Sequence, residues 1–573
     1  MPDRAVHVPF LHPGMTVAER LFGAPEGHDV DLSLDLIVTD DWTTPSLLDH
    51  LEARGATAAA VPIVLVHDHT RPASTYDGEE RAVAERLTAR RNAFVQRYGA
   101  RLIAHEGIQH HVLMERNLVR PGMRILGNDS HTPTLGAVGS LALAGQPATV
   151  ASAIRHGSVH VTVPSRFAIR LEGALAPGVT ARDAALTLLG QIADADGVPR
   201  ATVGRLLHLH GPAVQHLDRA ERAILANLAP EAVALTAVVE DDLGEDGAHD
   251  DLILDLSKVA PVMAASPSPT RAEEVRNLTG AAVDRVFVGT CAGGTVHEIQ
   301  AFADALLQAL PPGGRVAAYV LVAPATRAVA GELERRGVLG QLEAAGVTID
   351  APGCSACFGF GAKRLAEGET AVSTGNRNAR GRMGAPDAEI HLVAGATAGR
   401  IAAMGRLPGR AASHRRRAAQ NVRVAWPRSG NLVRLYGTVT TDDLTPSSVP
   451  GVGTSAASDP RTLRNLLLHY VDPSTSKRDL HGTILIADHA FGMGSNRASS
   501  VLALLAAGVR AVIARSVAPL YAMGARDAGL PVYAVGDDTI LFDAATPDAT
   551  ATLEGHQLRI EPPAAPVIVL SLR

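Results

Sequence analysis

Three cysteines stand in two glycine-rich motifs and are the residues of this chain best suited to bind a metal centre. Cys291 ends the motif GTC after the apolar run VDRVFV, and Cys354 and Cys357 form a CxxC within PGCSACFGFG. Three thiolates can hold three corners of an iron–sulfur cubane and leave the fourth iron open to a hydroxyl or carboxylate. A zinc site, which would need a fourth protein ligand or a water, and three unrelated buried thiols are the alternatives that the spacing leaves open.

Histidines beside acids form a second candidate group, suited to acid–base catalysis. The motifs VHDHT, EGIQHH and LGNDSHTPTLGAVG supply Asp68, His69, His110, Asp129, Ser130 and His131. A carboxylate next to an imidazole fixes its tautomer and can raise its basicity. Any one such histidine is more often structural than catalytic, but three of them, each in a predicted loop near an acid or hydroxyl, favour a site.

Two flexible segments carry groups that could bind carboxylates. STGNRNARGRMG and FGMGSNRASS supply Asn376, Arg377, Arg382, Ser495, Asn496 and Arg497. A guanidinium group matches a carboxylate through two parallel hydrogen bonds, so these segments could clamp a di- or tricarboxylic acid. The glycines of FGMG also resemble a phosphate-binding turn. Alone, these residues are as compatible with an ordinary turn as with an anion site.

The sequence predicts that the elements positioning these groups form layers of α/β structure. Short apolar runs, at 59–66, 283–288, 316–322 and 511–514, alternate with Ala- and Leu-rich stretches of helical length. This rhythm predicts buried, largely parallel strands with functional loops at their ends. The arginine-rich segment Arg406–Pro427 predicts an exposed connection between a larger N-terminal part and a smaller C-terminal part.

Composition and charge exclude several classes of function. The 573 residues suffice for three or four domains, and the net charge of −6 implies no general attraction to nucleic acid or membranes. No window reaches the about 18 consecutive apolar residues of a membrane span, and Met1 to Gly14 are too polar for a signal peptide. We therefore expect a cytoplasmic protein that binds a small polar molecule, neither a membrane nor nucleic acid.

Taken together, the motifs resemble those of the aconitase superfamily, in the family's order and over nearly the whole chain. NDSHTPTLGAVG is similar to the signature DSHTxTxGAxG, and GTC with PGCSAC resembles the three cluster ligands. Further matches are PGMRILG (121–127), ANLAPEA (226–232), GNRNARGR (375–382) and FGMGSNR (491–497). The resemblance implies that Cys291, Cys354 and Cys357 bind a [4Fe-4S] cluster.

The resemblance also implies an architecture. Three α/β domains, at 1–165, 166–268 and 269–405, would enclose the cluster, and a linker at 406–427 would lead to a swivelling α/β domain at 428–573. The large and small parts, which are separate chains in many 3-isopropylmalate dehydratases, would be fused in this one. We therefore expect that no separate small subunit is needed.

By the same resemblance, the reaction dehydrates and rehydrates a hydroxy di- or tricarboxylic acid. Ser495 would take the proton next to a carboxylate, and His69, oriented by Asp68, would protonate the departing hydroxyl. Two further pairs around the open iron would be His110 with Asp129 and His131 with Glu231. Substrate-binding roles are implied for Ser130, Asn227, Asn376, Arg377, Arg382, Asp442, Asn496 and Arg497.

The chain departs from the family pattern mainly around substrate recognition. Asp40 stands where a Gln or His usually touches the substrate, and its carboxylate would repel a polyanion unless it is protonated or paired. The other departures are Ala292 and Gly293 for the usual Thr-Asn, and Asn496, Ala498 and Ser499 within the usual GSSREH. The chain lacks a clear counterpart of the arginine that reads citrate's distal carboxylate, and Arg461 is a candidate replacement. We expect a specialised substrate, nearer to a 3-isopropylmalate dehydratase than to an aconitate hydratase.

An apoprotein that binds RNA or senses iron is the alternative from a different class, since some family members bind RNA after losing the cluster. The intact set of cysteines, Ser495 and the histidines favour catalysis. Salt-dependent RNA binding that appears only after iron removal would favour the alternative.

Overall fold

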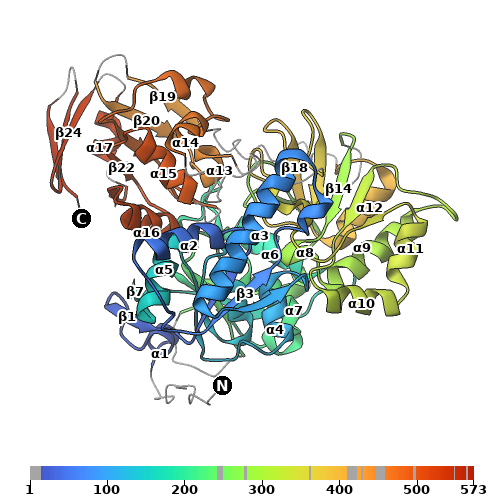
Figure 1. Ribbon diagram of the computed structural model, residues 1–573. Helices are drawn as coiled ribbons and strands as arrows, with labels where there is room; N and C mark the ends of the chain where they lie inside the picture. The colour runs from blue at the N-terminus through green and yellow to red at the C-terminus, as the bar shows by residue number, and fades with distance from the viewer. Residues whose placement is uncertain are drawn as a thin grey trace.

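The chain folds into layers of α-helices and mostly parallel β-sheets, which confirms the predicted α/β class (Figure 1). The computed structural model describes residues 15–241, 249–275, 280–360, 363–408, 422–427, 430–446, 459–494, 498–537, 539–546, 549–562 and 566–572. Among these residues, no helix is both long and apolar enough to cross a membrane.

The first sheet contains five parallel strands in the order β4-β3-β2-β5-β6. Their bounds are Arg101–Ala104, Ile63–His67, Leu36–Asp40, Arg124–Gly127 and Leu141–Ala144. Alternate residues of the strands enter two different cores: Val38 and Val66 face one, and Ile37 and Leu65 face the other. Because both faces of the central strands β2 and β3 are covered, all of their residues are buried.

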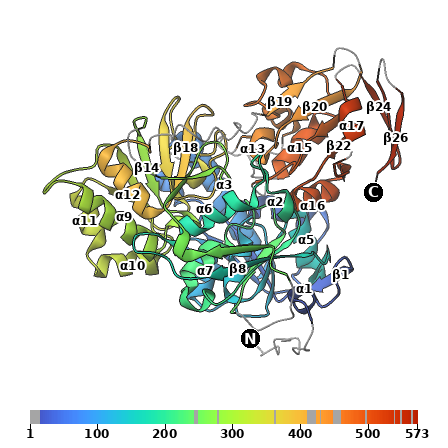
Figure 2. The same cartoon turned by 180° about the vertical axis from the view of Figure 1, so that it is seen from behind.

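The second sheet packs against the first through a shared core. It is parallel, in the order β10-β9-β8-β11, with bounds Thr236–Val239, Leu206–His210, Arg166–Glu172 and Leu252–Asp255. Leu207 and Leu209 of β9 join Val38 of the first sheet and apolar residues of α6 (Ala181–Ile192) and α7 (Arg219–Ala226). Figure 2, which views the molecule from behind, shows both helices. This common core fixes the two sheets relative to each other.

The third sheet carries the cysteine motifs. Its seven strands follow the order β13-β12-β18-β17-β14-β15-β16, at Ala272–Glu274, Val262–Ala264, Glu389–Val393, Thr370–Ser373, Arg285–Val288, Tyr319–Val322 and Thr348–Ile349. One face packs on α9 (Val296–Ala309) and α12 (Gly395–Met404), and the other receives Leu186 of α6. The sheet therefore packs directly against α6.

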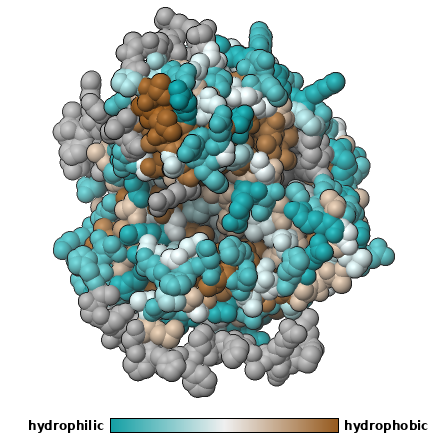
Figure 3. Space-filling view, turned by 90° about the vertical axis from the view of Figure 1, so that its left-hand side faces the viewer, coloured by the Kyte–Doolittle hydropathy of each residue, from teal (hydrophilic) through white to brown (hydrophobic). Residues whose placement is uncertain are grey.

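The C-terminal part forms a separate α/β layer beside the others (Figure 1). Strands β19 to β23 pair in chain order, at Arg423–Ala425, Leu432–Tyr436, Ile484–Ala487, Ala511–Ala514 and Val532–Ala534, and a three-stranded sheet follows at Thr550–Glu554, Gln557–Glu561 and Ile568–Ser571. Its outward face is mainly hydrophilic, with separate apolar patches (Figure 3).

The sheets divide the chain close to the predicted domains, with one difference. β12 (Val262–Ala264) lies before the predicted boundary at 268, yet it pairs with β18 of the third sheet. The described part of the predicted linker is 406–408 and 422–427, and residues 409–421 lie outside the described residues. The assignment of the domains, including a swivelling one at 428–573, stays a prediction.

Candidate active site

The candidate site is built on the carboxyl ends of three neighbouring strands of the first sheet. β3, β2 and β5 run parallel side by side, so the loops that follow them meet at one edge. These loops carry Asp68 and His69, Asp40 and Asp41, and the segment Asp129–His131. Ligands of open parallel sheets bind at this edge, and here the sequence places a row of ionisable groups on it.

Asp68 and His69 form the first acid–base pair. His69 Nδ1 lies 2.7 Å from Asp68 Oδ1, and Asp68 Oδ2 accepts the backbone N–H of Gln109 at 2.8 Å, where α4 (Gln109–Glu115) begins. Burial lowers the pKa of His69, but the carboxylates of Asp68 and Asp40 raise it, and the net pKa lies well above the usual range. The ring is therefore a cation that can give up a proton.

Asp129 joins three histidines. Its Oδ1 lies 3.2 Å from His110 Nε2 and 3.8 Å from His131 Nδ1, and its Oδ2 lies 3.8 Å from His69 Nε2. Burial raises the pKa of Asp129, but the hydrogen bond from His110 and the nearby histidines lower it overall. The carboxylate therefore stays ionised, and it lies in contact with all three imidazole rings.

Glu231 connects this group to the first cysteine motif. Its Oε1 lies 3.2 Å from His131 Nε2 and accepts the Nε–H of Arg377 at 2.8 Å. The Nδ2 of Asn376 lies 3.2 Å from His131 Nε2 and donates to Cys291 Sγ at 3.0 Å. Burial lowers the pKa of His131, which favours its neutral ring. A continuous polar network thus runs from Asp129 to the thiol of Cys291.

Arg377 links this network to two domains. Its Nη2 donates to Ser130 Oγ at 3.1 Å and to the carbonyl oxygen of Gly494, in the C-terminal part, at 3.2 Å. Its Nη1 has no hydrogen-bond partner among the described residues. Arg377 is 8% exposed, so a carboxylate that reached Nη1 would meet a largely desolvated cation.

The three cysteines converge on the same place from two loops. Cys291 lies in α8 (Thr290–Gly293), just after β14, and Cys354 precedes the short 3-10 helix Ser355–Phe358, which contains Cys357. The backbone N–H of Cys354 donates to the carbonyl of Asp68 at 3.0 Å, which docks the CxxC turn on the first acid–base pair. The ligand atoms of Asp68, His69 and Cys354 lie within 4.8 Å of one another.

The surroundings of the thiols fit an iron–sulfur cluster. Burial, and then the neighbouring Cys357, raise the pKa of Cys291 to about 12, and burial followed by Asp68 and the other two thiols raises that of Cys354. The three sulfurs therefore lie close enough for their charges to repel one another. As thiolates they need a strongly positive group among them. Hydrogen-bond donors also face the sulfurs: Asn376 reaches Cys291, and Arg382 Nη2 lies 3.7 Å from Cys357 Sγ.

The remaining predicted residues fall into two groups. Asn227 lies beside Cys291, with its Oδ1 3.6 Å from the Sγ, and its Nδ2 donates to Thr134 Oγ1 at 2.6 Å. Burial lowers the pKa of Arg382, but Cys357 and the buried Asp442 raise it overall, so Asp442 also belongs to this neighbourhood. Ser495, Asn496 and Arg497 lie outside the described residues, between Gly494 and Ala498, where α15 (Ala498–Ala506) begins.

Asp40 is hydrogen-bonded, which stabilises its carboxylate and weakens the repulsion expected from an unpaired one. Its Oδ1 accepts the N–H groups of Trp42 and Thr43 at 2.8 and 2.7 Å, and its Oδ2 accepts the Thr43 hydroxyl at 2.7 Å. These donors precede α2 (Thr44–Ala53). Burial nevertheless raises the pKa of Asp40 to about 6.

The glycine that replaces the family's asparagine is required by packing. A Cβ on Gly293 would lie 1.8 Å from the Thr374 hydroxyl oxygen, so no larger residue fits without displacing that side chain. Thr374 is itself fixed, because its hydroxyl oxygen accepts the N–H of Gly289 at 2.9 Å. Of the other departures, Ala292 is fully buried beside Cys291, and Ser499 contacts the Thr445 hydroxyl at 3.2 Å.

Two residues at the site were missed by sequence reasoning. Asp41 accepts the backbone N–H groups of the loop that carries His69. The Nε2 of His111 lies 2.7 Å from the carbonyl oxygen of Cys291, and burial lowers the pKa of His111 to about 4, so its neutral ring donates to that carbonyl. The only signals were the second acid of the Asp-Asp pair and the second histidine of QHH.

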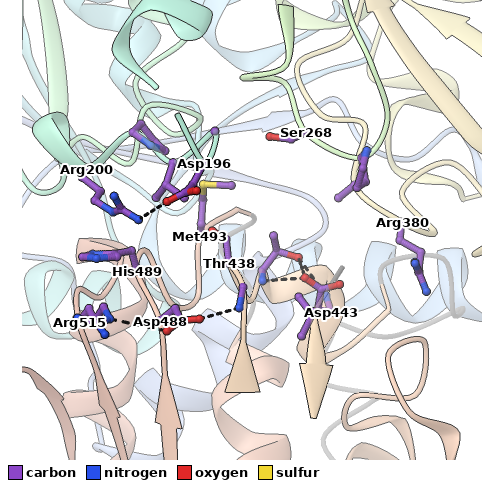
Figure 4. Close-up of a pocket in the computed structure, with 18 of the residues that line it drawn as sticks. Asp196, Arg200, Ser268, Arg380, Thr438, Asp443, Asp488, His489, Met493 and Arg515 are labelled. Carbon is purple, nitrogen blue, oxygen red and sulfur yellow. Dashed lines mark hydrogen bonds and ion pairs between the residues drawn. The ribbon is translucent and has the colours of Figure 1, made fainter. Parts of the chain in front are cut away.

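A cavity of about 410 Å³ lies between the C-terminal domain and the rest of the chain (Figure 4). Arg200 and Asp196 face it from one side, and Asp488 and Arg515, which follow β21 and β22, face it from the other. Arg380, from the same loop as Arg377, also lines it, and its Nη1 donates to the carbonyl of Tyr470 at 3.0 Å. The cavity and the site therefore share the loop 375–384.

Comparison with known proteins identifies the family. The sequence model of the aconitase family (aconitate hydratase) matches residues 16–243 and 253–405. The homoaconitase large subunit of Thermus thermophilus is 35% identical over 422 residues, which cover 69% of this chain and 97% of that protein. The 3-isopropylmalate dehydratase large subunit 1 of Deinococcus radiodurans is 34% identical over 420 residues, covering 68% and 93%.

Similarity to solved structures is weaker. Aconitase X from Thermococcus kodakaraensis matches 66% of this chain and 87% of its own, with a TM-score of 0.39 and 11% identity. A 3-isopropylmalate dehydratase from Methanocaldococcus jannaschii matches 25% of this chain and 80% of its own, with a TM-score of 0.21 and 24% identity.

The prediction that no separate small subunit is needed is wrong. The named relatives are large subunits, so each belongs to an enzyme with a second chain, and the matches to them cover only 68–69% of this chain. The error arose because fusion was inferred from total length and from short motifs, neither of which reports on subunit composition.

The matched ranges contain all three cysteines, the histidines and Arg377, so the family similarity and the polar network described above coincide in the chain. The chain belongs to the aconitase family and is a hydro-lyase.

Proposed function

We propose that this enzyme is a [4Fe-4S]-dependent isomerase that dehydrates and rehydrates a hydroxy di- or tricarboxylic acid, of the 3-isopropylmalate dehydratase type. The observation that carries the proposal is the meeting of three histidine–carboxylate contacts with three thiols, of which Cys291 is buried and Cys354 and Cys357 are half-buried. Cys291, Cys354 and Cys357 would hold the cluster. When bound, the cluster supplies a Lewis-acidic iron that takes the substrate's hydroxyl and carboxylate as ligands.

Different residues of this chain carry out the two proton transfers. Ser495 removes the proton next to a substrate carboxylate, as the family resemblance implies. His69 is the acid that protonates the leaving hydroxyl, because Asp68 holds its Nδ1–H and keeps the ring cationic while Nε2 faces Asp129 and the site. His110 with Asp129, and His131 with Glu231, are the pairs that would lie around the open iron.

Substrate carboxylates are bound by arginines in this proposal. Arg377 offers its Nη1, while its other donors are fixed on Glu231, Ser130 and the Gly494 carbonyl. Arg382 lies beside Cys357, close to where the cluster would sit, and Arg497 would complete the set. Asn376 donates its amide to the sulfur of Cys291, Asn227 places its Oδ1 beside that sulfur, and Asp442 lies near Arg382. A cytoplasmic location remains part of the proposal.

A homoaconitase-type substrate is the second candidate. The homoaconitase large subunit is as similar to this chain, at 35% identity, as the 3-isopropylmalate dehydratase large subunit is at 34%. A larger substrate would also need room, and the cavity of about 410 Å³ beside Arg380 would supply it if the substrate extends past the loop 375–384.

A panel of hydroxy acids tests the proposal and separates the two candidates. Anaerobically reconstituted protein, alone and after its second chain is identified by co-purification, is mixed with 2- and 3-isopropylmalate, homocitrate, citrate, isocitrate and citramalate. Formation of the unsaturated acid is followed by its ultraviolet absorbance. We expect iron-dependent growth of absorbance with one acid of the panel, an isopropylmalate before the others. No growth with any of them, when the cluster is intact and the second chain present, would refute the proposed substrate class.

A further inference from the structure

The two acids at the end of β2 serve different loops. Asp40 binds the N–H groups that precede α2, whereas Asp41 turns to the loop that follows β3. The Oδ1 of Asp41 accepts the N–H groups of Asp68 at 3.0 Å and His69 at 2.9 Å, and its Oδ2 accepts that of Thr70 at 2.9 Å. One carboxylate therefore binds three consecutive backbone N–H groups.

This arrangement fixes the backbone of the residues that form the first acid–base pair. Three N–H groups in a row can face one acceptor only when the peptide planes between them take one orientation. The Thr70 hydroxyl also donates to Asp41 Oδ2. Asp41 is 1% exposed, so these charge-assisted hydrogen bonds form away from water, where they are strongest and most directional.

A buried chain of groups behind Asp41 holds its carboxylate in place. His67 Nε2 lies 3.3 Å from Asp41 Oδ2 and 2.9 Å from Thr70 Oγ1. The Nδ1 of His67 faces the guanidinium of Arg91, which has donors only, so Nδ1 accepts and Nε2 carries the proton toward Asp41. His67 is 3% exposed and Arg91 is 8% exposed. The side chain of Asp41 therefore has a partner on each side.

We propose that Asp41 is a positioning residue for the reaction: through the backbone of Asp68–Thr70 it sets the orientation of His69, without touching the substrate. The proposal rests on the proposed role of His69 as the acid. The carbonyl oxygen of Asp68, in the same loop, also accepts the N–H of Cys354. A shift of the loop would therefore displace the CxxC turn as well. A displacement of about 1 Å at a reacting group is enough to cost about 100-fold in rate.

The test compares Asp41→Asn with Asp40→Asn in the reconstituted holoprotein by hydrogen exchange at single-residue resolution. The Asp41→Asn change would place an amide N–H₂ group where three N–H donors converge, so exchange at Asp68–Thr70 should rise at least about tenfold. Asp40→Asn removes a buried charge one residue away and should raise exchange at Trp42 and Thr43 instead. For Asp41→Asn we also expect kcat to fall about 10- to 100-fold with KM changed less than about threefold.

Thr70→Val keeps the proposal testable if Asp41→Asn does not fold. It removes one hydroxyl donor to Asp41 without a change of charge, and exchange at Asp68–Thr70 should rise about three- to tenfold. Unchanged exchange there in a folded Asp41→Asn protein, or in Thr70→Val when the former is unfolded, would overturn the proposal. Because exchange requires no substrate, this result is independent of whether the proposed reaction is correct.

Discussion

Replacing Ser495 with alanine should abolish turnover and leave the visible absorbance of the cluster unchanged. A proton next to a carboxylate is weakly acidic, and loss of the group that removes it costs at least about 10²- to 10⁴-fold in kcat. Ser495 directly follows Gly494, whose carbonyl oxygen accepts a hydrogen bond from Arg377 at 3.2 Å. Gly494, the last described residue before Ser495, is thus tied to the network. Steady-state kinetics and the absorbance spectrum of one preparation measure both effects.

Ser499→Ala is the matched control, because it removes a hydroxyl four residues further along the same segment. The Ser499 hydroxyl contacts Thr445 of the C-terminal domain, 3.2 Å away, rather than any of the histidines described above. We expect its kcat to change by less than about threefold. Normal turnover in Ser495→Ala would show that another group is the base.

Replacing Cys357 with serine should cost the cluster itself. An alkoxide is a poor replacement for a thiolate on iron of a sulfide cluster, and a ligand change should exceed the about 10- to 100-fold loss of affinity that follows changes in outer partners. The substitution also removes the sulfur that lies 3.7 Å from Arg382 Nη2. Iron and acid-labile sulfide per chain, measured after reconstitution, should both fall to near zero, and turnover should disappear with them.

Ala356→Ser provides the control for that experiment, since it adds the same hydroxyl group to the same turn and leaves all three thiols in place. It should keep the iron and sulfide content of the wild type. If Cys357→Ser also retained that content, Cys357 would not be a ligand, and the group Asp68, His69 and Cys354 would become the better metal site.

The α/β class and the positions of the ionisable loops could be predicted from the sequence, because they follow from local patterns. The apolar run at 59–66 marks a strand that ends at His67, and strand ends of parallel sheets gather on one edge. Pairs that are distant in sequence, such as His131 with Glu231, came from the family resemblance. These side chains lie in contact, whereas their catalytic roles stay predictions.

Contacts made through the backbone could not be predicted. Nothing in the sequence shows that the N–H groups of Trp42 and Thr43 satisfy Asp40, or that Asp41 turns the other way to bind Asp68–Thr70. From the sequence, Gly293 indicated only the loss of a polar contact near the cluster. The structure explains the glycine, because the Thr374 side chain fills the space that a Cβ would need. Subunit composition was also beyond the sequence pattern, because it depends on a second chain.

The most direct test of the account is whether the hydroxy acid binds at the cluster. Ser495→Ala protein, which should keep the cluster but not turn over, is reduced, and its electron paramagnetic resonance spectrum is recorded with and without the acid that the panel identifies. We expect the spectrum to change at acid concentrations near the KM of the wild type. An unchanged spectrum at saturating acid, or equal turnover by cluster-free wild-type protein, would contradict the proposed function.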